Sequence, residues 1–226
     1  MLELKNIYRG REVKFYDFFM EHKQALIDDF LKQNPTYKDV NATLPFASVP
    51  YQDGAINIED AWKHVPIKES LTSIVVEENR PKYPTGFKLL EHFGDACSGL
   101  AYLSMEPGMI LRRHTCPENK EAKRIRIHIP LIIPEGDIGF EVHAEEIRWD
   151  DIFAFNNQKA HSAWNLTSQR RLIFLIDMNR DACDMPPAPV WFPGCNDDAP
   201  RFEKTETESE VWQNSIKQQQ RKKDIK

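Results

Sequence analysis

The sequence predicts a mainly β fold, a sandwich or a jelly roll, and two observations carry this prediction. Between residues 100 and 178, apolar and polar residues alternate in several short runs, which is the pattern of strands with one buried face. Turn-forming segments such as 134–137 (Pro-Glu-Gly-Asp) and 156–157 (Asn-Asn) separate these runs. Many short strands joined by turns are typical of antiparallel sheets that close into a sandwich or jelly roll.

We expect one domain with three parts. Residues 1–98 are predicted to be helical or irregular and to pack on the core. Within them, residues 13–32 carry apolar side chains at helical spacing up to Asn34 and Pro35, and two shorter helical or irregular pieces are expected at 59–62 and 83–93. The β core should span residues 99–180, and residues 181–226 should form an extension that begins with prolines and ends in a charged tail.

The clearest predicted strand reads Lys-Arg-Ile-Arg-Ile-His-Ile at residues 123–129, with isoleucines on one face and Arg124, Arg126 and His128 on the other. If the isoleucines pack between two sheets, the basic face points to water. If the basic face lines the lumen instead, it needs an anion there, because an unpaired buried charge is costly. Further strands are expected at residues 140–142, 152–155, 161–164 and 171–178.

Three residues around this strand are candidates for chemistry. His114 precedes it and His161 follows it, although spacing alone does not show whether the two histidines converge on a metal. Arg171 follows His161 by ten residues, and residues 165–168 between them predict a hairpin turn. Such a hairpin would put Arg171 nearly abreast of His161 on a neighbouring strand, where its guanidinium could bind a carboxylate bidentately. An ordinary cross-strand arginine is the alternative.

Charge, glycine and cysteine usage argue against several classes of protein. The 226 residues include only nine glycines, none of them in a GxGxxG or GxxxxGK(S/T) motif, and the formal charge of -5 does not suit a nucleic-acid partner. The longest apolar run, residues 172–176, is far shorter than the ~20 residues of a membrane span. No CxxC pair and no N-terminal apolar stretch occur, so we expect a cytoplasmic protein with reduced thiols and no membrane partner.

Several motifs occur in a fixed order along the chain. They are W-K-H-V-P-I at 62–67, L-L-E-H-F at 89–93, P-G-x5-H-T at 107–115, R-I-H at 126–128, F-N-N-x3-H-x2-W at 155–164 and R-L-I-F-x2-D at 171–177. In this order and spacing they resemble the aspartyl/asparaginyl β-hydroxylase family, which consists of iron(II)- and 2-oxoglutarate-dependent oxygenases. The resemblance covers about residues 62–177.

The resemblance implies a double-stranded β-helix, that is, a cupin-like jelly roll with a metal at one open end, flanked by N-terminal helices and a C-terminal extension. Matched residue by residue, it implies that His114 and His161 bind iron(II) and that Arg171 binds the distal carboxylate of 2-oxoglutarate. Three further residues would lie around this cosubstrate: Arg126, His128 and Trp62.

The chain departs from the usual pattern of this chemistry at two positions. Cys116 stands where most such enzymes carry a carboxylate as third iron ligand, although this branch of the family has a small residue there. Water in that coordination position, a thiolate ligand and an oxidation-prone defect are the alternatives, and Glu118 is a less well-spaced carboxylate. Asn157 replaces an acidic residue expected near the second histidine.

The function that the resemblance implies is hydroxylation of an unactivated C–H bond, with dioxygen and 2-oxoglutarate as cosubstrates and succinate and carbon dioxide as products. We expect the substrate to be an amino acid, an amino-acid derivative or a natural-product intermediate. Two alternatives keep the same cofactors: hydroxylation of Asp or Asn side chains in a peptide or protein, and a related halogenation. A third alternative is a jelly-roll module that binds a metal or an organic anion without turnover.

Overall fold

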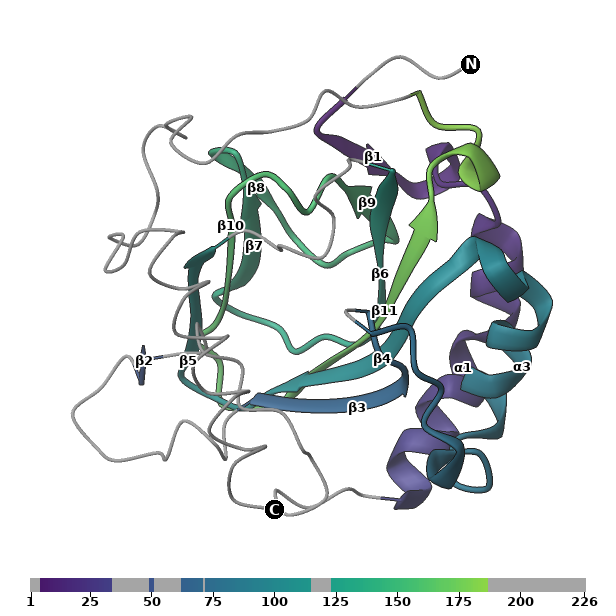
Figure 1. Cartoon of the computed structure of the whole chain (residues 1–226). Helices are drawn as coiled ribbons and strands as arrows, with labels where there is room; N and C mark the ends of the chain where they lie inside the picture. The colour runs from purple at the N-terminus through teal and green to yellow at the C-terminus, as the bar shows by residue number, and fades with distance from the viewer. Residues whose placement is uncertain (1–4, 34–48, 51–61, 71, 115–122, 187–226) are drawn as a thin grey trace, which may run out of the picture.

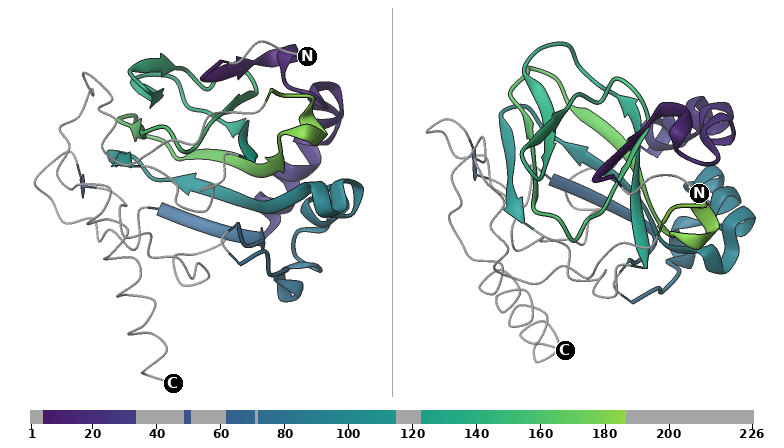
Figure 2. Two further views of the ribbon diagram at one scale, coloured as in Figure 1. Left: turned by 45° about the horizontal axis from the view of Figure 1, so that its top comes forward. Right: turned by 90° about the horizontal axis from the view of Figure 1, so that it is seen from above.

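Two antiparallel sheets face each other in the computed structural model, which describes residues 5–33, 49–50, 62–70, 72–114 and 123–186 (Figures 1 and 2). In spatial order, the larger sheet contains β1 (Ile7–Arg9), β9 (Phe153–Phe155), β6 (Arg124–Ile132), β11 (Arg171–Asn179), β4 (Cys97–Met105) and β3 (Trp62–Lys68). The smaller sheet contains β2 (Val49–Pro50), β5 (Met109–His114), β10 (His161–Asn165), β7 (Ile138–Val142) and β8 (Glu145–Ile147). This arrangement confirms the predicted mainly β jelly roll.

Two α-helices cover the face of the larger sheet that points away from the smaller one: α1 (Tyr16–Gln33) and α3 (Pro84–Phe93) (Figure 1). The Asp29 carboxylate of α1 accepts a hydrogen bond from the backbone N–H of Thr85 at 2.8 Å, which satisfies one of the orphan donors at the start of α3. The helix α1 confirms the helix indicated by the apolar spacing of residues 13–32, and α3 shows that the piece expected at 83–93 is helical. Short 3-10 helices occupy Gly10–Glu12, Glu77–Asn79, Gly94–Ala96 and Asp181–Cys183.

The orientation of β6 settles which face of the basic strand is inside. Ile125, Ile127 and Ile129 are fully buried in the cluster that includes the helix residues Phe19 and Phe87. The alternate residues of the strand therefore point between the two sheets. Arg126 and His128 are both buried there, so the basic face lines the interior and does not face water.

The strand β3 was not predicted, because Trp62 was expected to end a helical or irregular piece. Pro66 lies inside this strand and weakens the strand signal, since proline cannot donate a ladder hydrogen bond. The structure accommodates Pro66 because, among the described residues, β3 is the edge strand of the larger sheet and pairs with β4 alone. Most of the predicted piece 59–62, and the tail beyond residue 186, lie outside the described residues.

The predicted hairpin between His161 and Arg171 is wrong. β10 pairs with β5 and β7 in the smaller sheet, whereas β11 pairs with β4 and β6 in the larger one. The turn does form, but it carries the chain from one sheet to the other. Asn165 holds this corner, because its buried amide donates to the backbone oxygens of Met105, Glu106 and Gln169 at 3.1, 3.2 and 2.8 Å.

A second apolar cluster fills the space between the sheets. It includes residues of both sheets and of the segments that join them: Leu103, Met105, Leu111, Phe140, Trp149, Phe153, Phe155, Ile173 and Leu175. The side chains of His128, His161 and Arg171 contact aromatic residues of this cluster. Among the described residues, no helix has the length and apolar character needed to cross a membrane.

Candidate metal and cosubstrate site

The backbone brings the two candidate metal ligands together. His161 begins β10, and its Cα is directly paired with that of His114, the last residue of the antiparallel strand β5. Directly opposed residues of an antiparallel pair lie about 5 Å apart. The ladder then shifts register between His161 and Ala163, so an irregularity follows the paired histidines immediately.

The surroundings of the His161 ring fix its tautomer. Nδ1 lies 2.8 Å from the backbone oxygen of Lys159, which can only accept a hydrogen bond, so the proton belongs on Nδ1 and the lone pair on Nε2. A metal-binding histidine commonly donates its other N–H to a carbonyl in this way. The residue is 2% exposed, and its ring lies 5.2 Å from that of Phe155 and 5.7 Å from that of Phe140.

No complete metal cage is visible in the part of the chain that the structure describes, where no group of three or more His, Cys, Asp or Glu residues could hold an ion. Cys116 and Glu118, the two residues proposed for a third position, lie outside the described residues. Asn157 is buried in the turn between β9 and β10. Among the described residues, the histidines whose backbones are paired are therefore the candidate metal ligands.

Arg171 lies at the start of β11 and is completely buried. Its guanidinium lies over the indole ring of Trp149, with Cζ 4.4 Å from the ring centroid. Burial lowers the pKa of Arg171 to about 9, so the group still carries its charge at neutral pH. Met105 of β4 is paired with Arg171 on one side and with Trp62 of β3 on the other, which places Trp62 in the same row of the sheet.

Phe140 of β7 lies between the end of the interior that contains His161, called the histidine end, and the end that contains Arg171 and Trp149, called the arginine end. Its ring centroid lies 5.7 Å from that of His161, 5.2 Å from that of His128 and 5.6 Å from that of Trp149. His128 is enclosed further by Phe153 and Phe155, each 5.1 Å away. Burial, and then the charges of Arg126 and Arg171, lower the pKa of His128 well below its usual range, so this imidazole is neutral.

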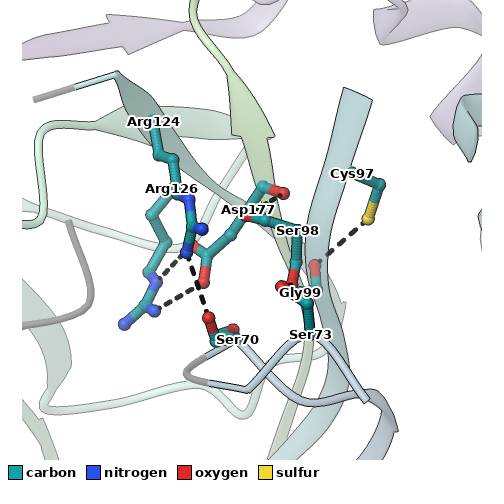
Figure 3. A network of polar contacts seen from close by, with 8 residues as sticks. All are labelled: Ser70, Ser73, Cys97, Ser98, Gly99, Arg124, Arg126 and Asp177. Carbon is teal, nitrogen blue, oxygen red and sulfur yellow. Dashed lines mark hydrogen bonds and ion pairs between the residues drawn. The ribbon is translucent and has the colours of Figure 1, made fainter. Parts of the chain in front are cut away.

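Arg126 forms a bidentate ion pair with Asp177 of β11, its cross-strand neighbour (Figure 3). Nε and Nη2 donate to the two carboxylate oxygens at 2.8 and 2.7 Å, and the two side chains are 10% and 1% exposed. Ser98 donates to the backbone oxygen of Asp177 at 3.2 Å, and Arg124 donates to that of Ser70 at 3.0 Å. Asp177, the last residue of the R-L-I-F-x2-D motif, thus fixes the orientation of Arg126.

Replacing Asp177 by Asn should lower the free energy of unfolding by about 3 kcal/mol. Removing one partner of a buried ion pair costs about 3–5 kcal/mol. We expect a value near the lower limit of this range, because the amide oxygen of Asn can still accept one hydrogen bond from Arg126. Chemical denaturation measures the change. The matched control is Asp17→Asn, which breaks the pair with Arg11, whose side chains are both 74% exposed, and should leave the unfolding midpoint unchanged. Equal effects of the two changes would contradict a stabilising role for the buried pair.

His64 should make the protein sensitive to mild acid. It alternates on β3 with Val65 and Ile67, which pack toward the helices, so it shares the interior with Arg126 and Asp177. Burial, and then the charge of Arg126, lower the pKa of His64 to about 4. Between pH 6.5 and 4 the unfolded chain therefore binds a proton that the folded protein does not, and the free energy of unfolding falls with pH by up to about 1.4 kcal/mol per unit.

Urea denaturation at pH 7 and pH 5 measures this slope, and His64→Gln should make it shallower. His128 contributes to the slope with the same sign, so part of it should remain in the variant. An unchanged slope would show that His64 does not titrate in this window.

Sequence reasoning did not identify two aromatic residues of this site: Trp149, and Phe140, for which it predicted only a strand at 140–142. Neither lies in one of the ordered motifs, and Trp149 belongs to the segment between β8 and β9, where no periodic pattern marks a buried side chain. Only the three-dimensional arrangement shows that the indole covers Arg171.

Comparisons with known proteins agree with the resemblance read from the motifs. The model of the family described as aspartyl/asparaginyl beta-hydroxylase matches residues 21–181, well over half of the chain. Two curated relatives, the aspartyl/asparaginyl beta-hydroxylases of Mus musculus and Homo sapiens, are each 30% identical over 101 residues. This alignment covers 42% of the chain but only 13% of each relative.

Solved structures with similar folds include a Pseudomonas putida prolyl-4-hydroxylase, with 8% identity and a TM-score of 0.43 over 70% of this chain and 86% of that one. Another is an oxidoreductase of the 2OG-Fe(II) oxygenase family from Burkholderia pseudomallei, with 10% identity and a TM-score of 0.39 over 53% and 68% of the two chains. The family match, rather than these distant similarities, decides the assignment: the chain belongs to the aspartyl/asparaginyl β-hydroxylase family.

Proposed function

We propose that this protein is an iron(II)- and 2-oxoglutarate-dependent oxygenase that hydroxylates an unactivated C–H bond of an amino acid, an amino-acid derivative or a natural-product intermediate. Succinate and carbon dioxide would be the other products. The observation that carries the proposal is the direct backbone pairing of His114 with His161, in a chain of this family. We propose residues 99–180 as the catalytic core.

His114 and His161 would hold the metal. Imidazole nitrogens suit iron(II), and two histidines leave coordination positions open to the cosubstrate and to dioxygen. The hydrogen bond from Nδ1 to the oxygen of Lys159 leaves Nε2 of His161 as the ligating atom. Bound iron, together with 2-oxoglutarate, supplies the oxidising chemistry, and the protein supplies placement and electrostatics.

Arg171 would bind the distal carboxylate of 2-oxoglutarate. Its guanidinium is charged at neutral pH, fully buried and in contact with the face of Trp149, so packing restricts its orientation before the cosubstrate arrives. Charge-assisted hydrogen bonds are strongest where water is excluded, which is the environment of this residue.

Arg126 and His128 would contact the cosubstrate between the metal and Arg171. The two side chains share one face of β6, and Asp177 prevents Arg126 from swinging away. His128 remains neutral, so its ring nitrogens can donate and accept hydrogen bonds without adding charge. The phenyl rings of Phe140, Phe153 and Phe155 exclude water from this part of the interior. Trp62 would border the site from the edge strand β3.

The test is a screen for succinate release over free amino acids, amino-acid derivatives and short peptides, with iron(II), ascorbate and 2-oxoglutarate. We expect turnover with at least one amino acid or derivative, and a product that gains one oxygen atom. Anaerobic binding of 2-oxoglutarate should be measured in parallel. Absence of binding at millimolar cosubstrate would overturn the oxygenase proposal, and binding without turnover of any compound would favour a binding module.

A second candidate is the hydroxylation of Asp or Asn side chains in a peptide or protein. The names of the two curated relatives favour it. Release of succinate with Asp- or Asn-containing peptides, and with no free amino acid, would select this candidate. Mass spectrometry in the presence of chloride separates both candidates from halogenation, because the product would then gain a chlorine atom instead of an oxygen atom.

A further inference from the structure

Trp149 lies at the arginine end of the interior, on the segment that crosses from β8 in the smaller sheet to β9 in the larger one. It is 2% exposed, and its ring packs against Phe140 and Phe153 at centroid distances of 5.6 and 6.5 Å. The guanidinium of Arg171 covers one face of the indole. Trp149 is therefore part of the immediate surroundings of the proposed carboxylate-binding arginine.

The indole nitrogen of Trp149 is a buried donor that the described residues do not satisfy, since none of them offers an acceptor within hydrogen-bond distance of Nε1. Tryptophan can only donate at this atom, and a buried donor without a partner is unfavourable. Trp164 shows the usual solution in the same protein, because its equally buried indole donates to the Asp137 carboxylate at 2.9 Å.

The apolar neighbours of Trp149 suggest that its unsatisfied N–H serves a ligand. The two aromatic rings that pack against it, Phe140 and Phe153, carry no polar atom, and the cluster around them is apolar. A tryptophan at this place adds a single hydrogen-bond donor beside a buried cation. A ligand with a negatively charged acceptor at this position would satisfy the indole N–H and would also be attracted by the charge of the guanidinium.

We propose that the Trp149 indole N–H donates a hydrogen bond to the distal carboxylate of the bound 2-oxo acid, beside Arg171. This inference rests on the proposed function. A carboxylate has about four lone-pair sites, so a group that accepts two hydrogen bonds from a guanidinium can accept a third from an indole. Trp149 would thus help Arg171 to select 2-oxo acids that end in a second carboxylate over those that end in a methyl group.

The first test compares two ligands of equal chain length in binding to Mn(II)-loaded protein by calorimetry. 2-Oxoglutarate carries the distal carboxylate, and 2-oxopentanoate has a methyl group in its place. Trp149→Phe keeps an aromatic face for Arg171 and removes the N–H. We expect the variant to bind 2-oxoglutarate roughly tenfold more weakly, in line with the loss of one hydrogen bond to a charged group, and to bind 2-oxopentanoate as the wild type does.

The second test measures the wild-type protein and uses the variants only to assign one signal. With Zn(II) as a diamagnetic metal, the nitrogen–proton spectrum shows one indole signal for each of the five tryptophans. The Trp149 signal, assigned by its loss in Trp149→Phe or Trp149→Tyr, should move strongly downfield with 2-oxoglutarate and little with 2-oxopentanoate.

The outcomes separate this inference from the proposed function. If the wild type binds 2-oxoglutarate but Trp149→Phe binds it equally well and the indole signal does not move, Trp149 is not a carboxylate donor and the proposed function stands. If Trp149→Phe weakens both ligands alike, its role is packing, and the inference is overturned. If the wild type binds no 2-oxoglutarate, the proposed function fails first.

Discussion

Replacing Arg171 by Met should weaken the binding of 2-oxoglutarate by roughly 10²–10³-fold. Removing one partner of a buried, hydrogen-bonded charge pair costs about 3–5 kcal/mol, and each 1.4 kcal/mol corresponds to a factor of ten. Methionine has a similar length and can pack against Trp149, so the change removes the charge without opening a large cavity. Calorimetry with the Mn(II)-loaded protein measures the dissociation constant.

The neighbouring Arg170 provides a matched control. Its side chain is 33% exposed and pairs with Glu106 at 2.6 Å, and its backbone lies outside β11. Arg170→Met should therefore bind 2-oxoglutarate like the wild type. Arg171→Lys should recover only part of the affinity, because an ammonium cannot reproduce a flat, bidentate guanidinium. Wild-type affinity in Arg171→Met would show that the distal carboxylate binds elsewhere.

Five strands of the β core (β6, β7, β9, β10 and β11) lie where the sequence predicted strands, whereas β4, β5 and β8 were not predicted individually. The clearest of the five was β6, because its two faces differ in chemistry. The alternation in β6 identified two faces, yet it did not show which one is inside. That depends on α1 and α3, which bury Ile125, Ile127 and Ile129 from the outside and leave Arg126 and His128 between the sheets. A strand pattern contains no information about what covers either face.

Other parts of the fold depend on long-range pairing and could not be predicted. A turn after β10 was correctly expected, but turn residues do not show whether the next strand joins the same sheet or the facing one. The crossing is held by contacts of Asn165 with Met105 and Glu106, about sixty residues earlier in the chain. β3 escaped detection because an edge strand tolerates Pro66, which a central strand would exclude.

The residues of the candidate site that lie in the ordered motifs could be predicted from the sequence. The motifs singled out His114 and His161, and the register of β5 with β10 then places their backbones opposite each other. Asp177 also belongs to a motif, but its partnership with Arg126 becomes visible only when β6 and β11 are paired. Trp149 lies in none of the motifs, and only its contact with Arg171 brings it into the candidate site.

Replacing His161 by Ala should abolish metal binding, weakening it on the order of a hundredfold or more. Loss of a residue that merely hydrogen-bonds to a metal ligand already lowers metal affinity about 10–100-fold. Loss of one of the two proposed protein ligands should therefore lower the affinity at least as much. Titration with Mn(II), followed by its electron paramagnetic resonance signal, measures binding without requiring turnover. Because His161 is buried, a thermal melt should accompany the titration to show that the variant is folded.

Two further histidines test the specificity of this result. His92→Ala changes an exposed residue of α3 that stacks on Phe18, outside the interior, and should bind Mn(II) like the wild type. His128→Gln changes a buried residue of the interior that we place at the cosubstrate and not at the metal. It should retain Mn(II) and lose affinity for 2-oxoglutarate. Loss of the metal in His128→Gln, with Mn(II) retained in His161→Ala, would move the metal from the end of β10 to the face of β6.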